Sequence, residues 1–146
     1  MTTPPPTTLA ALVLIPEEDA FSRVRQTVQA VLDVADARCP DLPAVGAADY
    51  VSALFQAIRR TRLAVADFSP REGGVQAGAD VLVAACALRF GVGAPVIALV
   101  RDRATLPTAW ASYPFVVAYD PSRDGLLELR KSLSQTVQGI AKTLKE

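Results

Sequence analysis

Three uninterrupted apolar runs constrain the fold of this chain more than any other feature of its sequence. They are Leu9–Ile15, Leu63–Ala66 and Pro95–Val100, and polar residues do not alternate with the apolar ones in any of them. A strand with one face in water shows such alternation, whereas a strand of a parallel sheet is covered on both faces. The runs therefore predict buried parallel strands.

Helical periodicity fills the segments between these runs. Apolar residues recur at helical spacing over Phe21–Ala35 and again over Val51–Ile58, where Asp49 is expected to cap the helix. A third helix, roughly Gln76–Phe90, is apolar almost all round, which indicates deep burial or a subunit interface. A long closing helix begins near Asp124 and carries Leu126, Leu129, Leu133, Val137, Ile140 and Leu144 at three- and four-residue spacings.

Strands that alternate with helices predict an α/β fold with three αβα layers around a five-stranded parallel, flavodoxin-like (Rossmann-like) sheet of order 2-1-3-4-5. Strand two has to be short and at an edge, because Arg38–Gly46 contains two prolines. Strand five is expected at Phe115–Tyr119. With 146 residues, of which 51% are hydrophobic, we expect one domain over 9–146 after a disordered lead over 1–8.

Composition excludes several classes of function. The formal net charge is zero and the basic residues are spread along the chain, which argues against a nucleic-acid partner. The chain has no histidine, so Ser-His or Cys-His catalysis and histidine-ligated zinc are excluded, and no metal or other cofactor is expected. The two cysteines form no C-x-x-C motif, and Cys86 is expected to be a buried free thiol.

The sequence also argues against a membrane protein. The apolar stretch Val81–Val100 is interrupted by Arg89, two glycines and a proline, so a helix, a turn and a buried strand explain it better than a membrane span. The segment Met1–Thr8 lacks the basic and apolar regions of a secretory signal. We expect a cytoplasmic protein.

Candidate ligand-binding residues follow strands one and three. In an open α/β sheet the ligand crevice lies beyond the carboxyl ends of the strands, where the strand order reverses, and here that point falls between strands one and three. Pro16 and Glu17 follow strand one, and Asp67 and Ser69 follow strand three. Asp67 has two interpretations: it faces the crevice, or it caps the loop after its strand.

An ordered pattern runs across three of the predicted strands. Its parts are Ile15-Pro16 with Phe21 and Val24, then Ala57–Ser69, then an alanine-rich helix that leads into Ala94–Leu99. Over roughly residues 9–119 this pattern resembles the nucleoside 2-deoxyribosyltransferase-like group, which includes TIR-like nucleotide-binding domains. No single motif within it is highly specific.

The resemblance implies roles for particular residues. In that group the aspartate at the tip of the third strand, here Asp67, lines a nucleoside or nucleotide pocket, and a glutamate early in the next helix acts at the anomeric carbon of the sugar. The corresponding position here falls near Val81, which is not a carboxylate. Asp80 and Glu72 are the remaining candidates for the catalytic carboxylate.

Two functions therefore follow from the sequence. One is an enzyme that cleaves or transfers at the N-glycosidic bond of a nucleoside or a nicotinamide dinucleotide. The other is a non-catalytic nucleotide-sensing or protein-interaction scaffold that forms a homo-oligomer through its third and last helices. The missing glutamate favours the second, and fold alone does not decide between them.

Overall fold

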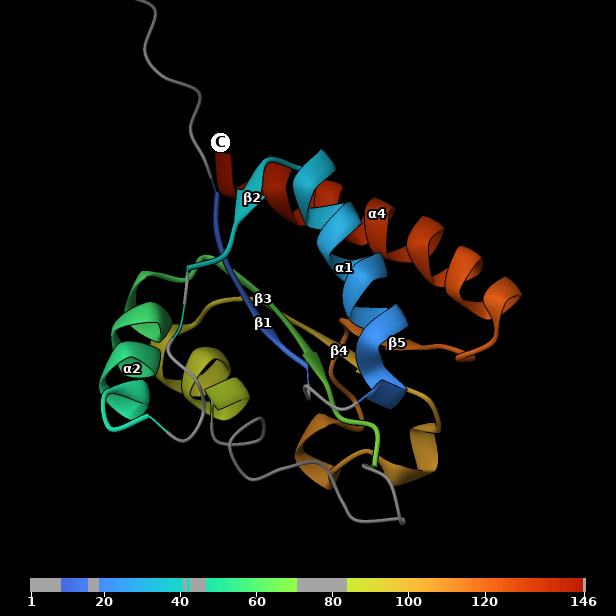
Figure 1. Cartoon of the computed structure of the whole chain (residues 1–146), viewed down its shortest axis with the longest axis horizontal. Helices are drawn as coiled ribbons and strands as arrows, with labels where there is room; N and C mark the ends of the chain where they lie inside the picture. Colours follow the sequence, from blue (N-terminus) through green and yellow to red (C-terminus); the bar gives the residue numbers. More distant parts are fainter. Residues whose placement is uncertain (1–8, 16–18, 41, 43–46, 71–83, 146) are drawn as a thin grey trace, which may run out of the picture.

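A parallel sheet forms the centre of the molecule. The structure is a computed structural model, and it describes residues 9–15, 19–40, 42, 47–70 and 84–145. In this part of the chain five strands pair in the order β2-β1-β3-β4-β5, and all neighbours are parallel (Figure 1). The strands are β1 (Leu9–Leu14), β2 (Ala37–Arg38), β3 (Leu63–Asp67), β4 (Val96–Val100) and β5 (Val116–Ala118). The predicted strand order is confirmed.

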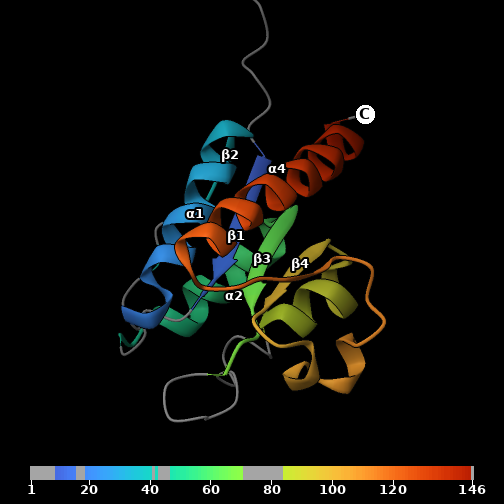
Figure 2. The same cartoon turned by 90° about the vertical axis from the view of Figure 1, so that its right-hand side faces the viewer.

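Helices cover both faces of the sheet. The helices α1 (Ser22–Val34) and α4 (Arg123–Lys145) pack together on one face, while α2 (Tyr50–Arg60) and the π-helix η3 (Ala87–Val92) lie on the other (Figures 1 and 2). In the described ranges, three short 3-10 helices lie in connections: η1 (Asp19–Phe21), η4 (Arg103–Thr105) and η5 (Thr108–Trp110). This is the predicted three-layer αβα architecture.

The central strands fill two hydrophobic cores at once. In β4, Ile97 and Leu99 pack toward α1 and α4, whereas Val96, Ala98 and Val100 pack toward the opposite helices. All five residues of β4 are fully buried. Since successive side chains of a strand point to opposite faces, a strand covered on both sides needs apolar residues at every position. The uninterrupted runs in the sequence reflect this double coverage.

The second strand is short, as its prolines predicted. It pairs with β1 only through Leu9↔Ala37 and Ala10↔Arg38, so it begins just before the segment where we expected it. It follows a turn in which Asp36 adopts a positive φ of 56°. Two residues beyond β2, Pro40 has no backbone N–H to donate to a neighbouring strand.

Helix α2 departs from its prediction in two ways. Asp49 precedes it but makes no side-chain capping hydrogen bond, because its backbone (φ −95°, ψ 3°) is not in the extended conformation that capping requires. The apolar stripe is only partly buried: Ile58 lies in the core, while Val51 and Phe55 are 59% and 53% exposed. The sequence pattern therefore overstated how much of this helix the core covers.

The described part of the third helix begins at residue 84 and is buried on one side only. Ala84, Ala85 and Leu88 are buried, but Phe90 is 64% exposed. Cys86 is a free thiol, but it is half-buried rather than buried. The helix ends at Gly93, whose φ of 77° suits a residue without a Cβ, and β4 follows. Among the described residues, no helix is long and apolar enough to cross a membrane.

The packing of α4 yields a matched pair of stability predictions. Leu133 of α4 is completely buried, whereas Leu127 on the same helix is 53% exposed. We expect Leu133→Ala to lower the free energy of unfolding by about 2–5 kcal/mol through lost burial and a cavity. The control Leu127→Ala should change it by less than about 0.5 kcal/mol. Urea unfolding followed by circular dichroism measures both, and equal losses would contradict this assignment of the core face.

Candidate functional site

Four side chains meet at the carboxyl edge of the sheet. Asp67 ends β3, Ser69 lies two residues further, Arg101 follows β4 directly and Tyr119 follows β5 directly. Parallel strands in register end at the same edge, and here Asp67 is level with Leu99 of β4. We call Asp67, Ser69, Arg101 and Tyr119 the carboxyl-edge cluster.

Asp67 is the centre of this cluster and is fully buried. Its Oδ1 accepts a hydrogen bond from the Ser69 backbone N–H at 2.8 Å, and its Oδ2 accepts one from the Tyr119 hydroxyl at 2.6 Å. A buried carboxyl group needs such partners, because burying a polar group without them is costly. The loop-capping interaction expected for Asp67 is therefore present, while its contact with a ligand stays a prediction.

Arg101 connects the ends of several strands. Its backbone N–H donates to Ser69 Oγ at 2.9 Å, and its Nε donates to the Tyr119 hydroxyl at 3.2 Å. A terminal nitrogen of the same guanidinium donates to the Ala20 carbonyl in η1 at 2.7 Å, and the guanidinium carbon lies 4.7 Å from the centre of the Phe21 ring. One side chain thus holds η1, β4 and the residue after β5 together.

The sequence predicted only two members of this cluster. Asp67 and Ser69 follow a recognisable buried strand, but Arg101 looks like the first residue of a polar connector and Tyr119 like the end of a strand. One sequence signal could have identified Arg101 and Tyr119: each is the first polar or polar-tipped residue after a strand, at the same edge of the sheet. Pro16, Glu17, Glu72 and Asp80 lie outside the described residues.

Burial controls the ionisation of this cluster. It raises the pKa of Asp67, although the hydrogen bonds from Tyr119 and Ser69 and the charge of Arg101 act in the opposite direction. Burial also raises the pKa of Tyr119, and the nearby Asp67 carboxyl group raises it further. Tyr119 therefore keeps its proton at neutral pH and remains the donor to Asp67.

A small polar hollow adjoins Arg101. It has a volume of 240 Å³ and lies beside the first turns of α1 and α4. Its lining comprises Asp19, Ala20, Ser22, Arg23, Val24, Arg101, Pro121 and Leu126. Its charged lining consists of two arginines, which can bind an anionic group, and one carboxylate, Asp19, which opposes it.

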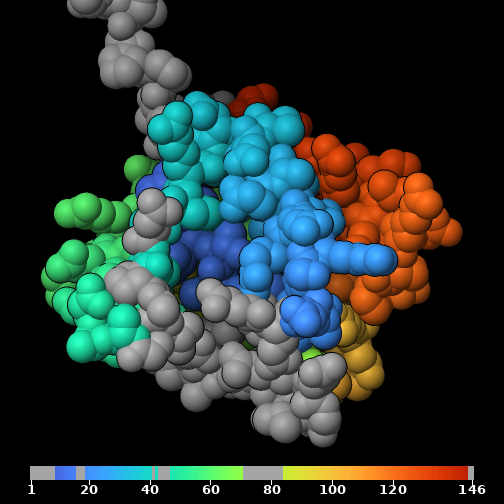
Figure 3. Space-filling model, in the orientation of Figure 1, coloured from blue at the N-terminus to red at the C-terminus, as the bar shows by residue number. Residues whose placement is uncertain are grey.

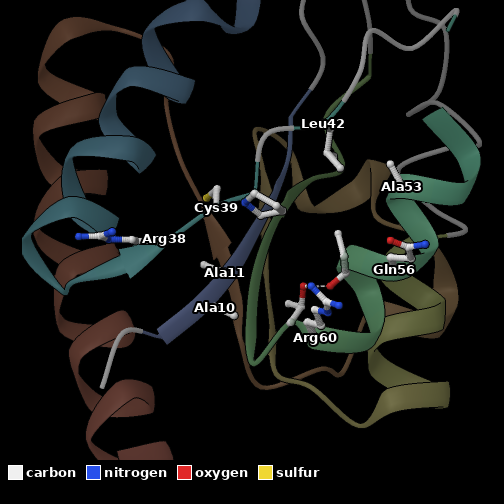
Figure 4. Close-up of a pocket in the computed structure, with 11 residues that line it drawn as sticks. Ala10, Ala11, Arg38, Cys39, Leu42, Ala53, Gln56 and Arg60 are labelled. Atoms are coloured by element: carbon white, nitrogen blue, oxygen red, sulfur yellow. Dashed lines mark hydrogen bonds between the residues drawn. The ribbon is translucent and has the colours of Figure 1, made fainter. Parts of the chain in front are cut away.

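A second hollow, of 420 Å³, lies near the starts of β1 and β3, away from the carboxyl-edge cluster (Figure 4). Gln56 and Arg60 approach it from α2, whereas the side chain of Arg38 extends away from that helix. Burial and the charge of Asp33 raise the pKa of the Cys39 thiol at its rim. Because the thiolate is the reactive form of cysteine, this hollow offers no activated nucleophile from Cys39.

Neither hollow suggests a metal centre. In the part of the chain that the structure describes, no group of three or more Cys, Asp or Glu side chains is arranged to hold a metal ion.

Comparison with known proteins supports the fold. No protein-family model and no curated protein sequence matches the chain. Among solved structures, the chain is similar to a 2-deoxyribosyltransferase from Leishmania mexicana, with a TM-score of 0.52 and 17% sequence identity. The match covers 64% of this chain and 65% of that chain, so this chain spans somewhat less than two thirds of that protein's length. The two share the flavodoxin-like α/β fold that the sequence predicted.

The raised pKa of Asp67 predicts a pH-dependent stability. Because the folded protein binds this proton more tightly than the unfolded chain, stability is fully present below the unfolded pKa of about 4 and is lost as pH rises through the folded pKa. The wild type should therefore lose stability relative to Asp67→Asn over this window. Urea midpoints of both proteins between pH 4 and 8 measure the effect, and parallel curves would contradict it. Tyr119→Phe, which removes a hydrogen bond that lowers the pKa, should extend the loss to higher pH.

Proposed function

We propose that this domain binds a nucleoside or nucleotide at the carboxyl edge of its sheet, between the ends of β1 and β3. The observation that carries the proposal is the buried Asp67 at the tip of β3, next to the point where the strand order reverses. The fold similarity to a 2-deoxyribosyltransferase supports it, as does the resemblance seen in the sequence.

The residues of this edge have different roles in the proposal. Asp67 contacts the sugar or base of the ligand, or positions the loop that does so, while Ser69, Pro16 and Glu17 line the pocket. Arg101 faces the 240 Å³ hollow and binds a phosphate group there, since its planar guanidinium suits phosphate oxygens. The hollow lies at the start of α1, where the helix dipole also favours an anion.

The native tryptophan allows a direct binding test. Trp110 is the only tryptophan, and its ring lies 4.9 Å from that of Phe68, the residue between Asp67 and Ser69. We expect its fluorescence to change saturably on titration with deoxynucleosides, nucleoside monophosphates or NAD, with calorimetry as confirmation. Arg101→Met should weaken the binding of nucleotides about tenfold or more and the binding of nucleosides less. The control Arg62→Met, before β3 at the other end of the sheet, should have no effect, and no binding of any of these compounds would refute the proposal.

Catalysis at an N-glycosidic bond is the finer form of this proposal. In it, Asp80 or Glu72 supplies the carboxylate that stabilises or attacks the anomeric carbon. Purified protein incubated with deoxynucleosides and with NAD should release free base or nicotinamide, detected by chromatography. The release should disappear in Asp80→Ala or in Glu72→Ala. Binding without release would assign the domain to nucleotide sensing instead.

A self-associating scaffold is the second candidate, and exposed apolar side chains favour it. Val51 and Phe55 of α2 and Phe90 and Val92 of η3 are between 44% and 64% exposed, and α2 contacts η3. The leucine-rich helix α4 does not offer a comparable surface, because its regularly spaced apolar residues, Leu126, Leu129, Leu133, Val137 and Ile140, are buried in the core.

Sedimentation tests the scaffold directly. We expect the wild type to form a dimer or larger species at micromolar concentration, and the double variant Phe55→Ser/Phe90→Ser to shift toward monomer as apolar contact area is lost. Leu127→Ser, on the opposite side of the sheet, is the matched control and should leave the distribution unchanged. A wild-type protein that remains monomeric would exclude this candidate.

A further inference from the structure

A groove runs along the outer surface of the helix pair α1 and α4. In Figure 3 these two helices, in blue and orange, lie directly against each other at the surface. The groove has a volume of 460 Å³, and each helix lines it with residues spaced i, i+3, i+4 and i+7, which share one helix face. We call it the arginine groove; its lining is Arg23, Gln26, Thr27, Ala30, Arg123, Leu126, Leu127 and Arg130.

Every charged residue that lines this groove is an arginine. The whole chain has equal numbers of basic and acidic residues. The groove differs from this overall charge balance, because three arginines and no carboxylate line it. Asp124 belongs to the first turn of α4 but does not line the groove. None of the three arginines has an ion-pair partner among the residues that the structure describes. Within the described part of the chain, the groove thus presents positive charge without an ion-pair partner.

Two of these arginines lie where a helix disfavours them. Arg23 is the second residue of α1 and Arg123 is the first residue of α4. The positive end of the helix dipole is at the N-terminus, so a cation in the first turn is unfavourable. A negatively charged partner in the groove would compensate both the arginines and the two helix ends.

The groove also has an apolar component. Leu127 is 53% exposed and lies between Arg123 and Arg130, while Leu126 beside it is buried. A purely anionic ligand would pair with the arginines but leave Leu127 exposed. A partner with both acidic and apolar side chains would pair with the arginines and also cover Leu127.

The spacing on α4 indicates the shape of that partner. Arg123 and Arg130 are seven residues apart, which corresponds to about 10 Å along the helix axis. Acidic residues seven apart on a second helix have the same spacing, and an apolar residue between them comes level with Leu127. We propose that the arginine groove docks an amphipathic helix of a partner protein, with acidic residues at this spacing on either side of an apolar one. This interaction goes beyond the proposed nucleotide binding and does not depend on it.

A designed peptide tests the proposal. The probe is a fluorescein-labelled helical peptide of about 20 residues, long enough to be helical in water, with glutamates seven apart flanking a leucine. We expect the anisotropy of the peptide to rise to saturation as protein is added. The affinity should fall as the salt concentration rises, because the arginines are exposed. Two control peptides of the same length, one with the glutamates at shuffled positions and one with lysine in their place, should bind about tenfold more weakly or not at all.

Matched protein variants connect the binding to the groove. Arg123→Glu/Arg130→Glu should weaken binding of the peptide about tenfold or more. Arg59→Glu/Arg62→Glu makes the same charge change at the end of α2 and in the connection to β3, away from the groove, and should not weaken it. Circular dichroism verifies that both variants fold. Arg23 is left unchanged because it also lines the hollow beside Arg101, so ligand-induced Trp110 fluorescence reports nucleotide binding separately.

Three results would overturn the proposal. The first is no binding of the acidic peptide. The second is an affinity that does not change when the glutamates are shuffled or when Arg123 and Arg130 are replaced. The third is tighter binding of duplex DNA or of phosphatidylserine vesicles through the same two arginines, which would assign the groove to a different class of partner.

Discussion

The coverage of β3 and β4 on both faces is the constraint on which the rest of this structure depends. Val65 and Ile97 face one core while their neighbours Ala64 and Ala98 face the other, and all four are fully buried. A polar side chain in the middle of either strand would be buried without a partner, at considerable cost. Polar chemistry is therefore confined to the strand ends, where loops and neighbouring strands supply hydrogen-bonding groups.

The carboxyl-edge cluster shows how such an end is stabilised. Asp67 is the first polar side chain of β3, and its burial is tolerated because Ser69 and Tyr119 donate to both carboxyl oxygens. Arg101 then links this carboxyl network to η1 through the Ala20 carbonyl. The edge where a ligand is proposed to bind is thus held by contacts between several strands rather than within one loop, which is the preorganisation that a binding site needs.

Prediction succeeded where the signal was local. The strands, the short second strand and the closing helix follow from runs, prolines and helical periodicity. The end of a strand also located Asp67 and Ser69, whose contact with a ligand stays a prediction. Prediction failed where the outcome depends on tertiary packing. The backbone conformation of Asp49 does not permit a side-chain cap, and Phe55 lies exposed because the core does not extend to it. Tyr119 was not predicted as a member of the carboxyl-edge cluster because its partner Asp67 lies 52 residues away in the chain.

The sequence by itself determined the order of strands and helices along the chain and, to within one residue, where β1, β3, β4 and β5 end. It could do so because hydrophobic periodicity depends on residues that are close in the chain. Only the tertiary structure decided which of those ends meet. The pairing of Tyr119 with Asp67 and the reach of Arg101 to Ala20 depend on strand order and register across the sheet. The same holds for the arginine groove, since the stripes of α1 and α4 are 100 residues apart and become one surface only when both helices pack on the same face.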